Sequence, residues 1–233
     1  MVSHAACASL LPGIEVVDDA HMADRVAQKL NELTADEPRL SIVFSGGQIA
    51  PRVLETFVRN FLNGRGLTVI VADERITTNI GDTNARLLKA ALVSGGATDT
   101  VRLVAPTQGV SLAESAEGFE AEVRNAPEVA AAVVGVGTDG HIASLFPSGA
   151  LHAVGVVDVV TNAPSPFSQR ISLSMEFLRA IPLRMVALAG KEKAVVLDAL
   201  ADGKLLPVAR LDPTHTFVSE DAANAFATAG AKS

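Results

Sequence analysis

A histidine and an aspartate lie two residues apart in residues 137–141, which read Gly-Thr-Asp-Gly-His. Histidine is the side chain whose ordinary pKa, about 6.5, lets it take and release protons near neutral pH. A carboxylate this close can accept a hydrogen bond from one ring nitrogen and fix the tautomer, or it can bind a substrate hydroxyl. We therefore predict that His141 and Asp139 are catalytic, with His141 as a general base. The alternative is an ordinary histidine of a surface loop.

Two further segments carry groups that suit a negatively charged ligand. Ser45, Gly46 and Gly47 precede a predicted helix, so backbone N–H groups and the helix N-terminus can meet an anion there without interference from Cβ atoms. Asp73 and Arg75 follow a predicted strand, and an arginine near such a loop is a natural phosphate clamp. The alternatives are a tight strand-to-helix turn in the first case and solvated surface charge in the second.

Several well-known chemistries lack their sequence signatures. The glycine segment has neither the Gly-Lys-Ser/Thr ending of a nucleotide-binding P-loop nor the Gly-x-Gly-x-x-Gly pattern of dinucleotide binding, so we expect that it does not bind a nucleotide. No cysteine cluster or His-x-x-x-His pair accompanies His141, so we expect no metal. Gly-x-Ser-x-Gly is also absent, which makes Ser144 a weaker candidate for a nucleophile.

The overall charge limits the partners. The formal net charge is −7 and the pI is near 5.2, whereas nucleic acids and anionic membranes attract basic surfaces. We therefore expect neither partner, and a negatively charged substrate must be met by local cationic groups. Cys7 is the one cysteine, which excludes an internal disulfide and suits the reducing cytoplasm. No pattern reveals an oligomeric state, and we expect a monomer.

Alternating strands and helices must position these groups. The apolar patterns predict strands at 40–44, 67–72, 101–104, 129–136, 154–160, 170–173 and 185–189, and helices at 22–33, 51–62, 82–93, 112–123 and 191–200. Parallel strands need crossover connections, which helices usually supply, so we predict an α/β fold with a mostly parallel sheet. Ligands of such sheets bind beyond the carboxyl ends of the strands. Because no linker or repeat is visible, we expect residues 1–233 to form a single domain.

The motifs together resemble one known family. The strongest match is Gly135-x-Gly137-x-Asp139-Gly140-His141-x-Ala-Ser-Leu-Phe-Pro147. Supporting matches are Ser45-Gly46-Gly47 with Pro51, Asp73-Glu74-Arg75, Asp82-Thr83-Asn84, Arg170-Ile-Ser-Leu-Ser174 and Gly190-x-x-Lys193. In this order and over most of the chain, the sequence resembles the glucosamine-6-phosphate isomerase/6-phosphogluconolactonase superfamily, and within it the compact bacterial lactonases.

The resemblance implies a fold, a reaction and a substrate site. The fold would be a three-layer α/β sandwich similar to that of glucosamine-6-phosphate deaminase. The reaction would be cofactor-free hydrolysis of 6-phosphogluconolactone, a small phosphorylated sugar lactone, to 6-phosphogluconate in the pentose phosphate pathway. The substrate-binding residues would be Ser45, Gly46, Gly47, Asp73, Arg75, Gly137, Arg170 and Lys193, with Lys191 as the alternative to Lys193.

Two other functions stay open. An isomerase or deaminase of amino-sugar phosphates would resemble this chain at the Gly-His loop, but its acidic Asn-Glu-Pro segment is replaced here by Leu145, Phe146 and Pro147. A sugar-phosphate sensor without catalysis usually carries a DNA-binding module, for which the residues before Leu40 leave no room. The sequence therefore favours the lactonase.

Overall fold

The computed structural model describes residues 7–97, 101–149, 155–164 and 166–230. In this part of the chain, seven parallel strands form the central sheet in the order β1-β10-β9-β6-β2-β3-β5. These strands are β1 (Ile14–Val17), β2 (Arg39–Phe44), β3 (Gly66–Val71), β5 (Val101–Val104), β6 (Val129–Gly135), β9 (Leu183–Leu188) and β10 (His215–Ser219). The predicted mostly parallel sheet is thereby confirmed.

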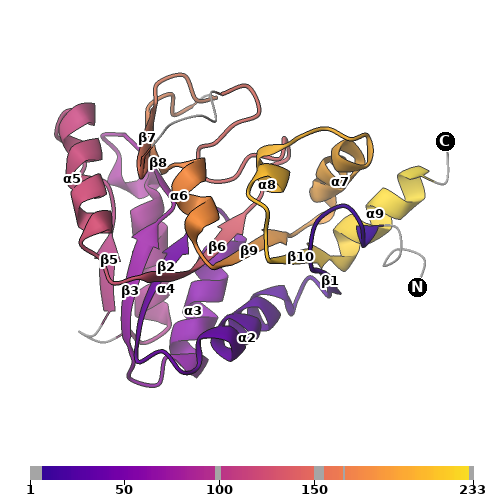
Figure 1. Cartoon of the computed structure of the whole chain (residues 1–233), viewed down its shortest axis with the longest axis horizontal. Helices are drawn as coiled ribbons and strands as arrows, with labels where there is room; N and C mark the ends of the chain where they lie inside the picture. The colour runs from indigo at the N-terminus through magenta and orange to yellow at the C-terminus, as the bar shows by residue number, and fades with distance from the viewer. Residues whose placement is uncertain (1–6, 98–100, 150–154, 165, 231–233) are drawn as a thin grey trace.

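Helices cover both faces of this sheet (Figure 1). One face packs against α2 (Met22–Thr34), α3 (Ile49–Phe61) and α4 (Asn84–Ser94). The other face packs against α5 (Leu112–Arg124), α6 (Met175–Ala180), α7 (Ala194–Ala201), α8 (Pro207–Arg210) and α9 (Glu220–Gly230). Two apolar clusters, one on each side of the sheet, form the core, so the architecture is the expected three-layer sandwich.

Strand β6 lies in the middle of the sheet because its sequence is apolar on both faces. In the run of Val and Ala from residue 129 to 134, residues 131–134 are buried on both sides, as a parallel strand between two helical layers requires. Its neighbours are β2 on one side and β9 on the other. The chain runs outward from β2 through β3 to β5 and then returns to β6, so strand order reverses between β2 and β6. A crevice at such a reversal is the usual ligand site of an open α/β sheet.

Three of the segments that carry charged or strand-like patterns belong to a second sheet, which corrects the prediction that all strands alternate with helices in one sheet. Here β4 (Asp73–Arg75), β8 (Arg170–Leu173) and β7 (Val157–Val160) pair antiparallel in the order β4-β8-β7. The predicted strand at 154–160 therefore starts later among the described residues, and Val154 lies outside them. Antiparallel pairing of distant segments depends on tertiary contacts that no local pattern reveals.

Other differences concern the ends of the chain and the helix starts. The edge strand β1 and its neighbour β10 were not predicted, because each is a short run with mixed polar and apolar residues. The predicted helix at 82–93 is preceded by the 3₁₀ turn η1 (Ile80–Asp82), and the one at 191–200 by the 3₁₀ turn η2 (Lys191–Lys193). Such short turns at helix starts are common and are difficult to distinguish from helix by sequence.

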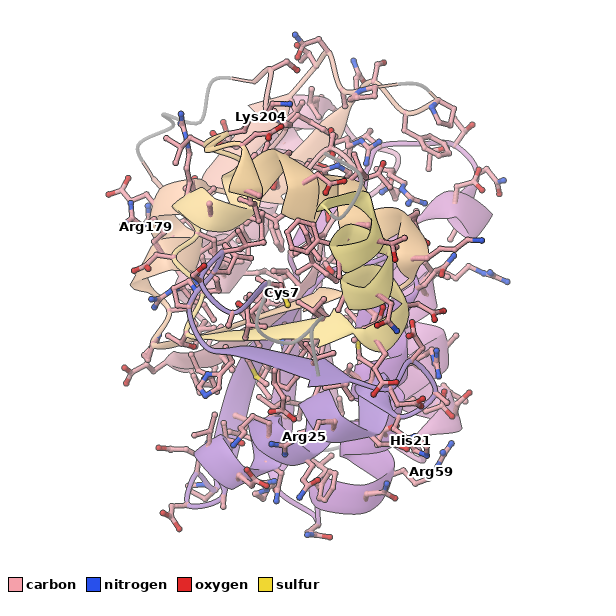
Figure 2. The ribbon with its side chains drawn as sticks, turned by 90° about the vertical axis from the view of Figure 1, so that its right-hand side faces the viewer. Cys7, His21, Arg25, Arg59, Arg179 and Lys204 are labelled. Carbon is pink, nitrogen blue, oxygen red and sulfur yellow. The ribbon has the colours of Figure 1, made fainter. Side chains whose placement is uncertain are left out.

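The single cysteine lies inside the protein. Figure 2 shows Cys7 at the centre of its view, and the residue is completely buried, whereas the labelled Arg59 and Lys204 lie at the periphery. Burial raises the pKa of the Cys7 thiol, which favours the protonated form over the nucleophilic thiolate. Among the helices of the described residues, none combines the length and the apolar character needed to cross a bilayer.

Candidate active site

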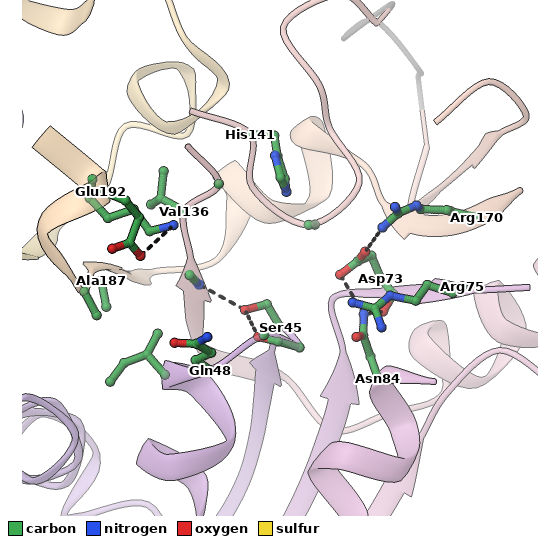
Figure 3. Close-up of a pocket in the computed structure, with 18 residues that line it drawn as sticks. Ser45, Gln48, Asp73, Arg75, Asn84, Val136, His141, Arg170, Ala187 and Glu192 are labelled. Atoms are coloured by element: carbon green, nitrogen blue, oxygen red, sulfur yellow. Dashed lines mark hydrogen bonds and ion pairs between the residues drawn. The ribbon is translucent and has the colours of Figure 1, made fainter. Parts of the chain in front are cut away.

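A cavity of about 290 Å³ opens at the crevice between β2 and β6 (Figure 3). The residues that line it come from strands β4 and β8, from the ends of β6 and β9, from the segments that follow β2, β6 and β9, and from the start of α4. They are Ser45, Gly46, Gly47, Gln48, Ile49, Asp73, Arg75, Asn84, Gly135, Val136, Gly137, His141, Ala143, Arg170, Ala187, Ala189, Glu192 and Lys193. All site residues predicted from the sequence are among them except Asp139. The volume is near the lower end of the range of small-molecule sites, roughly 300–1,000 Å³.

His141 points into this cavity, and Asp139 holds it from behind. The Asp139 Oδ1 atom lies 2.5 Å from the Nδ1 atom of His141 and also accepts a hydrogen bond of 3.1 Å from the His141 backbone N–H. Burial alone raises the pKa of Asp139, but these two hydrogen bonds outweigh it and the net pKa is lowered. Asp139 is therefore an ionised acceptor at neutral pH, so Nδ1 must be the protonated nitrogen. The Nε2 lone pair of the neutral imidazole is then available to take a proton.

The backbone around His141 is folded tightly, which explains the glycines. A Cβ atom on Gly137 would lie 2.1 Å from the His141 ring, so no other residue fits there without moving the imidazole. The Gly137 backbone N–H donates to the carbonyl of His141 over 2.8 Å, which closes the loop. Beyond His141, Ala143 has a left-handed φ of 49°, a conformation that costs a non-glycine residue about 1–2 kcal/mol. Strain of this kind concentrates at functional sites.

The glycine segment after β2 packs against Asn84, a pocket residue to which the sequence analysis gave no role. A Cβ atom on Gly46 would lie 2.0 Å from the Asn84 Oδ1 atom, so only glycine fits. The Asn84 amide donates to the Asp73 backbone carbonyl over 2.8 Å and lies 3.3 Å from the Asp73 Oδ1 atom. Asn84 thereby connects two loops of the site. Its place in the Asp82-Thr83-Asn84 motif was the one signal that pointed to it.

Glu74 is completely buried and holds the start of α4 in place. One carboxylate oxygen accepts hydrogen bonds from the backbone N–H groups of Arg75 and Asn84, and the other accepts one from Ala85. Burial raises the pKa of Glu74, and the three backbone hydrogen bonds partly offset the increase. The carboxylate therefore caps the N-terminus of α4 and fixes Asp73 and Arg75 relative to Asn84.

Asp73 is the buried acid of the pocket. Its side chain is 6% exposed, and Ser144 Oγ donates to its Oδ2 atom over 2.6 Å. Burial raises the pKa of Asp73, while the Ser144 hydrogen bond and the charge of Arg170 oppose the increase. Ser144, which the sequence analysis considered as a nucleophile, is thus engaged as a donor to Asp73.

Two arginines meet because β4 and β8 pair antiparallel, with Arg75 directly opposite Arg170. Arg75 donates to the carbonyl of Asp82 over 2.8 Å, and its guanidinium lies 5.4 Å from the centre of the Phe167 ring. Arg170 donates to the carbonyl of Phe167, and its Nη1 atom lies 4.0 Å from Asp73 Oδ2. Burial lowers the pKa of Arg170 and Asp73 opposes this; an arginine stays protonated in either case.

The remaining cation of the pocket lies at the other end. Lys193 lies in the 3₁₀ turn η2, which follows β9 after Gly190, and its Nζ atom lies 3.8 Å from Glu192 Oε1. Figure 3 shows Glu192 across the cavity from Arg75 and Arg170, with Ser45 and His141 between them. The cationic side chains of the cavity are therefore divided between two ends. Lys193 is among the residues that line the cavity and Lys191 is not.

The site is built for a small molecule that carries negative charge. Three cationic side chains, the amides of the glycine segment and one proton-accepting imidazole face a common cavity. Within the described ranges, no group of three or more histidine, cysteine or acidic residues lies close enough together to hold a metal ion. The fold and this pocket together define an α/β protein with a cavity at the reversal point of its sheet that is lined by cationic side chains, backbone amides and a histidine.

The family follows from comparison with known proteins. A family described as glucosamine-6-phosphate isomerases/6-phosphogluconolactonase matches residues 18–220, and the chain belongs to it. A 6-phosphogluconolactonase of Pseudomonas aeruginosa is 30% identical over 198 residues, which cover 80% of this chain and 83% of that protein. A 6-phosphogluconolactonase of Xylella fastidiosa is 30% identical over 197 residues, which cover 78% and 81%. The resemblance seen in the sequence is confirmed, and with it the enzyme class, a lactonase.

Solved structures agree on the fold. A 6-phosphogluconolactonase of Thermotoga maritima superposes with a TM-score of 0.77 at 22% identity and covers 90% of this chain and 100% of that chain. A monomeric glucosamine-6-phosphate deaminase gives a TM-score of 0.74 at 13% identity, covering 91% and 99%. The expected similarity to the deaminase fold is thereby confirmed.

Proposed function

We propose that this enzyme hydrolyses 6-phosphogluconolactone to 6-phosphogluconate, with His141 as the general base. The observation that carries the proposal is the imidazole, which Asp139 anchors through Nδ1 while it faces a cavity lined by amides and cationic side chains. The choice of substrate rests on the relatives named above, which are 6-phosphogluconolactonases. The pentose phosphate pathway and the cytoplasm are the setting that this reaction suggests.

The proposed reaction needs two proton transfers, one from water to His141 and one from His141 to the ring oxygen of the lactone. His141 Nε2 takes a proton from water while the water oxygen bonds to the lactone carbonyl carbon, and the carbonyl oxygen becomes an oxyanion. Backbone N–H groups near Gly137 or in the Ser45 loop stabilise that oxyanion. The tetrahedral intermediate then breaks its bond to the ring oxygen, which receives the proton from the His141 imidazolium. The new carboxyl group ionises, and the imidazole is neutral again.

The phosphoryl group lies over the amides of Ser45, Gly46 and Gly47, and Arg75, Arg170 and Lys193 supply the compensating charge. Lys193 lies beside Glu192, which Figure 3 shows across the cavity from the two arginines. A single phosphoryl group therefore contacts directly only one of the two cationic ends of the cavity. The other end faces the lactone, where negative charge develops as the carboxylate forms. A divided cationic site therefore suits a substrate whose product is an anion at both ends.

Turnover of freshly prepared lactone tests the proposal. The purified protein is mixed with 6-phosphogluconolactone, and 6-phosphogluconate is measured with a coupled dehydrogenase against the spontaneous hydrolysis of the same buffer. Glucosamine 6-phosphate with an ammonia assay is the parallel arm for the deaminase. Hydrolysis at the spontaneous rate would refute the lactonase, and ammonia release would replace it with the deaminase.

The histidine is tested by substitution. His141→Ala is expected to lower kcat by about 10²–10⁴-fold with little change in KM, because a general base acts in the transition state and not in ground-state binding. Steady-state kinetics above the spontaneous background measure both constants. A His141→Ala enzyme with the kcat of the wild type would remove the general base from the mechanism.

A further inference from the structure

Phe146 touches the two most important side chains of the proposed reaction without lining the cavity itself. Its ring centre lies 4.8 Å from that of His141, with 45° between the ring planes. The guanidinium carbon of Arg170 lies 5.5 Å from the same phenyl centre. Phe146 is 7% exposed and the Arg170 side chain 13%, so the contact between these two is largely shielded from water, while the His141 side chain is 32% exposed.

Each contact has a different physical effect. An aromatic ring carries partial negative charge on its face, and a cation over that face is attracted most strongly where water is excluded. Arg170 is such a cation before and after substrate binds, so this contact fixes the guanidinium in place. His141 becomes a cation only after it has taken a proton from water, so its contact with the ring gains strength along the reaction.

The other contacts leave room for this role. Asp139 restrains the His141 ring through Nδ1, but one hydrogen bond still allows the imidazole plane to tilt. Arg170 is held at Nε by the Phe167 carbonyl, while its Nη1 atom is a distant 4.0 Å from Asp73. The Phe146 ring, which is tilted by 45° to the imidazole and lies beneath the guanidinium carbon, restricts the remaining freedom of both groups. Small errors of position cost catalytic sites a large share of their rate.

We propose that Phe146 is a positioning residue that aligns the His141 imidazole and the Arg170 guanidinium on one aromatic platform. The proposal rests on the proposed lactonase reaction. An aliphatic side chain of similar size would fill the space but would supply neither the flat surface nor the attraction for cations. The aromatic character of residue 146, and not its volume, is therefore what the site requires.

Phe146→Leu tests this requirement, with Phe146→Tyr as the conservative variant. Leucine is expected to lower kcat and raise KM, each by about 2- to 30-fold, which is the range that cation–π contacts span. Tyrosine keeps the ring and is expected to restore both constants to within about threefold. Phe119→Leu is the matched control, because Phe119 is a buried phenylalanine of α5 that does not line the cavity. It should lose a similar amount of stability and keep its kinetic constants.

Two readouts separate positioning from loss of structure. In an Arg170→Ala background, Phe146→Leu should no longer raise KM, because the guanidinium that the ring positions is gone. The downfield proton resonance of His141 Nδ1–H, assigned by its loss in His141→Ala, should shift or broaden in Phe146→Leu and persist in Phe146→Tyr and Phe119→Leu.

Two outcomes would overturn the proposal. One is additive effects of the Arg170 and Phe146 substitutions on KM. The other is a Phe146→Leu enzyme with kinetic constants within twofold of the wild type and an unshifted resonance. If the wild-type protein has no lactonase activity but the His141 resonance still depends on Phe146, the proposed reaction is refuted and the alignment of His141 by Phe146 is supported.

Discussion

Replacement of Asp139 by asparagine tests how much the carboxylate charge contributes to catalysis. Asp139→Asn keeps the shape of the side chain and removes its negative charge. A hydrogen bond to a charged group contributes about 1.5–3 kcal/mol and a neutral one about 0.5–1.5 kcal/mol, so roughly 1 kcal/mol is at stake. The Asp139 side chain is 47% exposed, and screening by water favours the lower end of this difference. We expect kcat to fall about fivefold.

The geometry also limits the loss. An asparagine that turned its NH₂ group toward the imidazole would force the wrong tautomer and abolish the base. In this structure the same oxygen, Oδ1, accepts hydrogen bonds from the His141 ring and from the His141 backbone N–H. The backbone N–H therefore keeps the amide oxygen on that side. KM should stay unchanged, since Asp139 does not line the cavity.

Steady-state kinetics of Asp139→Asn with 6-phosphogluconolactone measure both constants. The hydrogen bonds from His141 lower the pKa of Asp139 overall, so the effect should persist from neutral pH down to the ordinary range of a carboxyl group. Asp18→Asn is the matched control, because Asp18 contacts His21 Nδ1 at 2.8 Å on the surface, where Figure 2 shows His21. An unchanged kcat would show that the charge has no role, and a thousandfold loss would show that the amide has turned and that the geometric argument is wrong.

Three other variants probe the cavity. Asp73→Asn should be more stable than the wild type at pH 7, because burial raises the Asp73 pKa; the difference should shrink as pH falls through that raised pKa toward 3.8, and urea unfolding at several pH values measures it. Gly46→Ala places a Cβ atom 2.0 Å from Asn84 Oδ1 and should lower the free energy of unfolding by about 1–3 kcal/mol, which a melting curve reports. The same variant should bind the substrate more weakly and so have a higher KM. Arg170→Ala should raise KM about 10- to 150-fold for the phosphorylated lactone; the same increase with unphosphorylated gluconolactone would place Arg170 at the lactone end of the cavity.

Local patterns were sufficient for much of the fold. The apolar runs of β2, β3, β5, β6 and β9 and the amphipathic patterns of α2, α3 and α5 are properties of contiguous residues, and each predicted element lies within a few residues of its place in the structure. The fully apolar run of β6 even indicated its central position. Strands β1 and β10 were missed because short segments of mixed polarity lack a distinctive period.

The site residues could likewise be predicted where their partners are close in the sequence, and were missed where the partners are far away. The link between Asp139 and His141 spans two residues, so a glycine-bounded loop was enough to suggest it. Lys193 could be favoured over Lys191 from its spacing after Gly190. By contrast, the role of Asn84 depends on its contacts with Gly46 and Asp73, which come from two other loops. The division of the cations between two ends of the cavity was likewise invisible before the strands were arranged.

By itself, the sequence determined the parallel α/β fold, the family and the histidine on its glycine loop, because these depend on neighbours along the chain and on motifs of fixed spacing. Only the tertiary structure decided that β4 and β8 pair antiparallel, which puts Arg75 opposite Arg170, and that Phe146 lies against both Arg170 and His141. The physical reason is that a contact with a segment far along the chain, such as that of Arg75 with Arg170, is selected by the packing of the whole core, which a local pattern does not record.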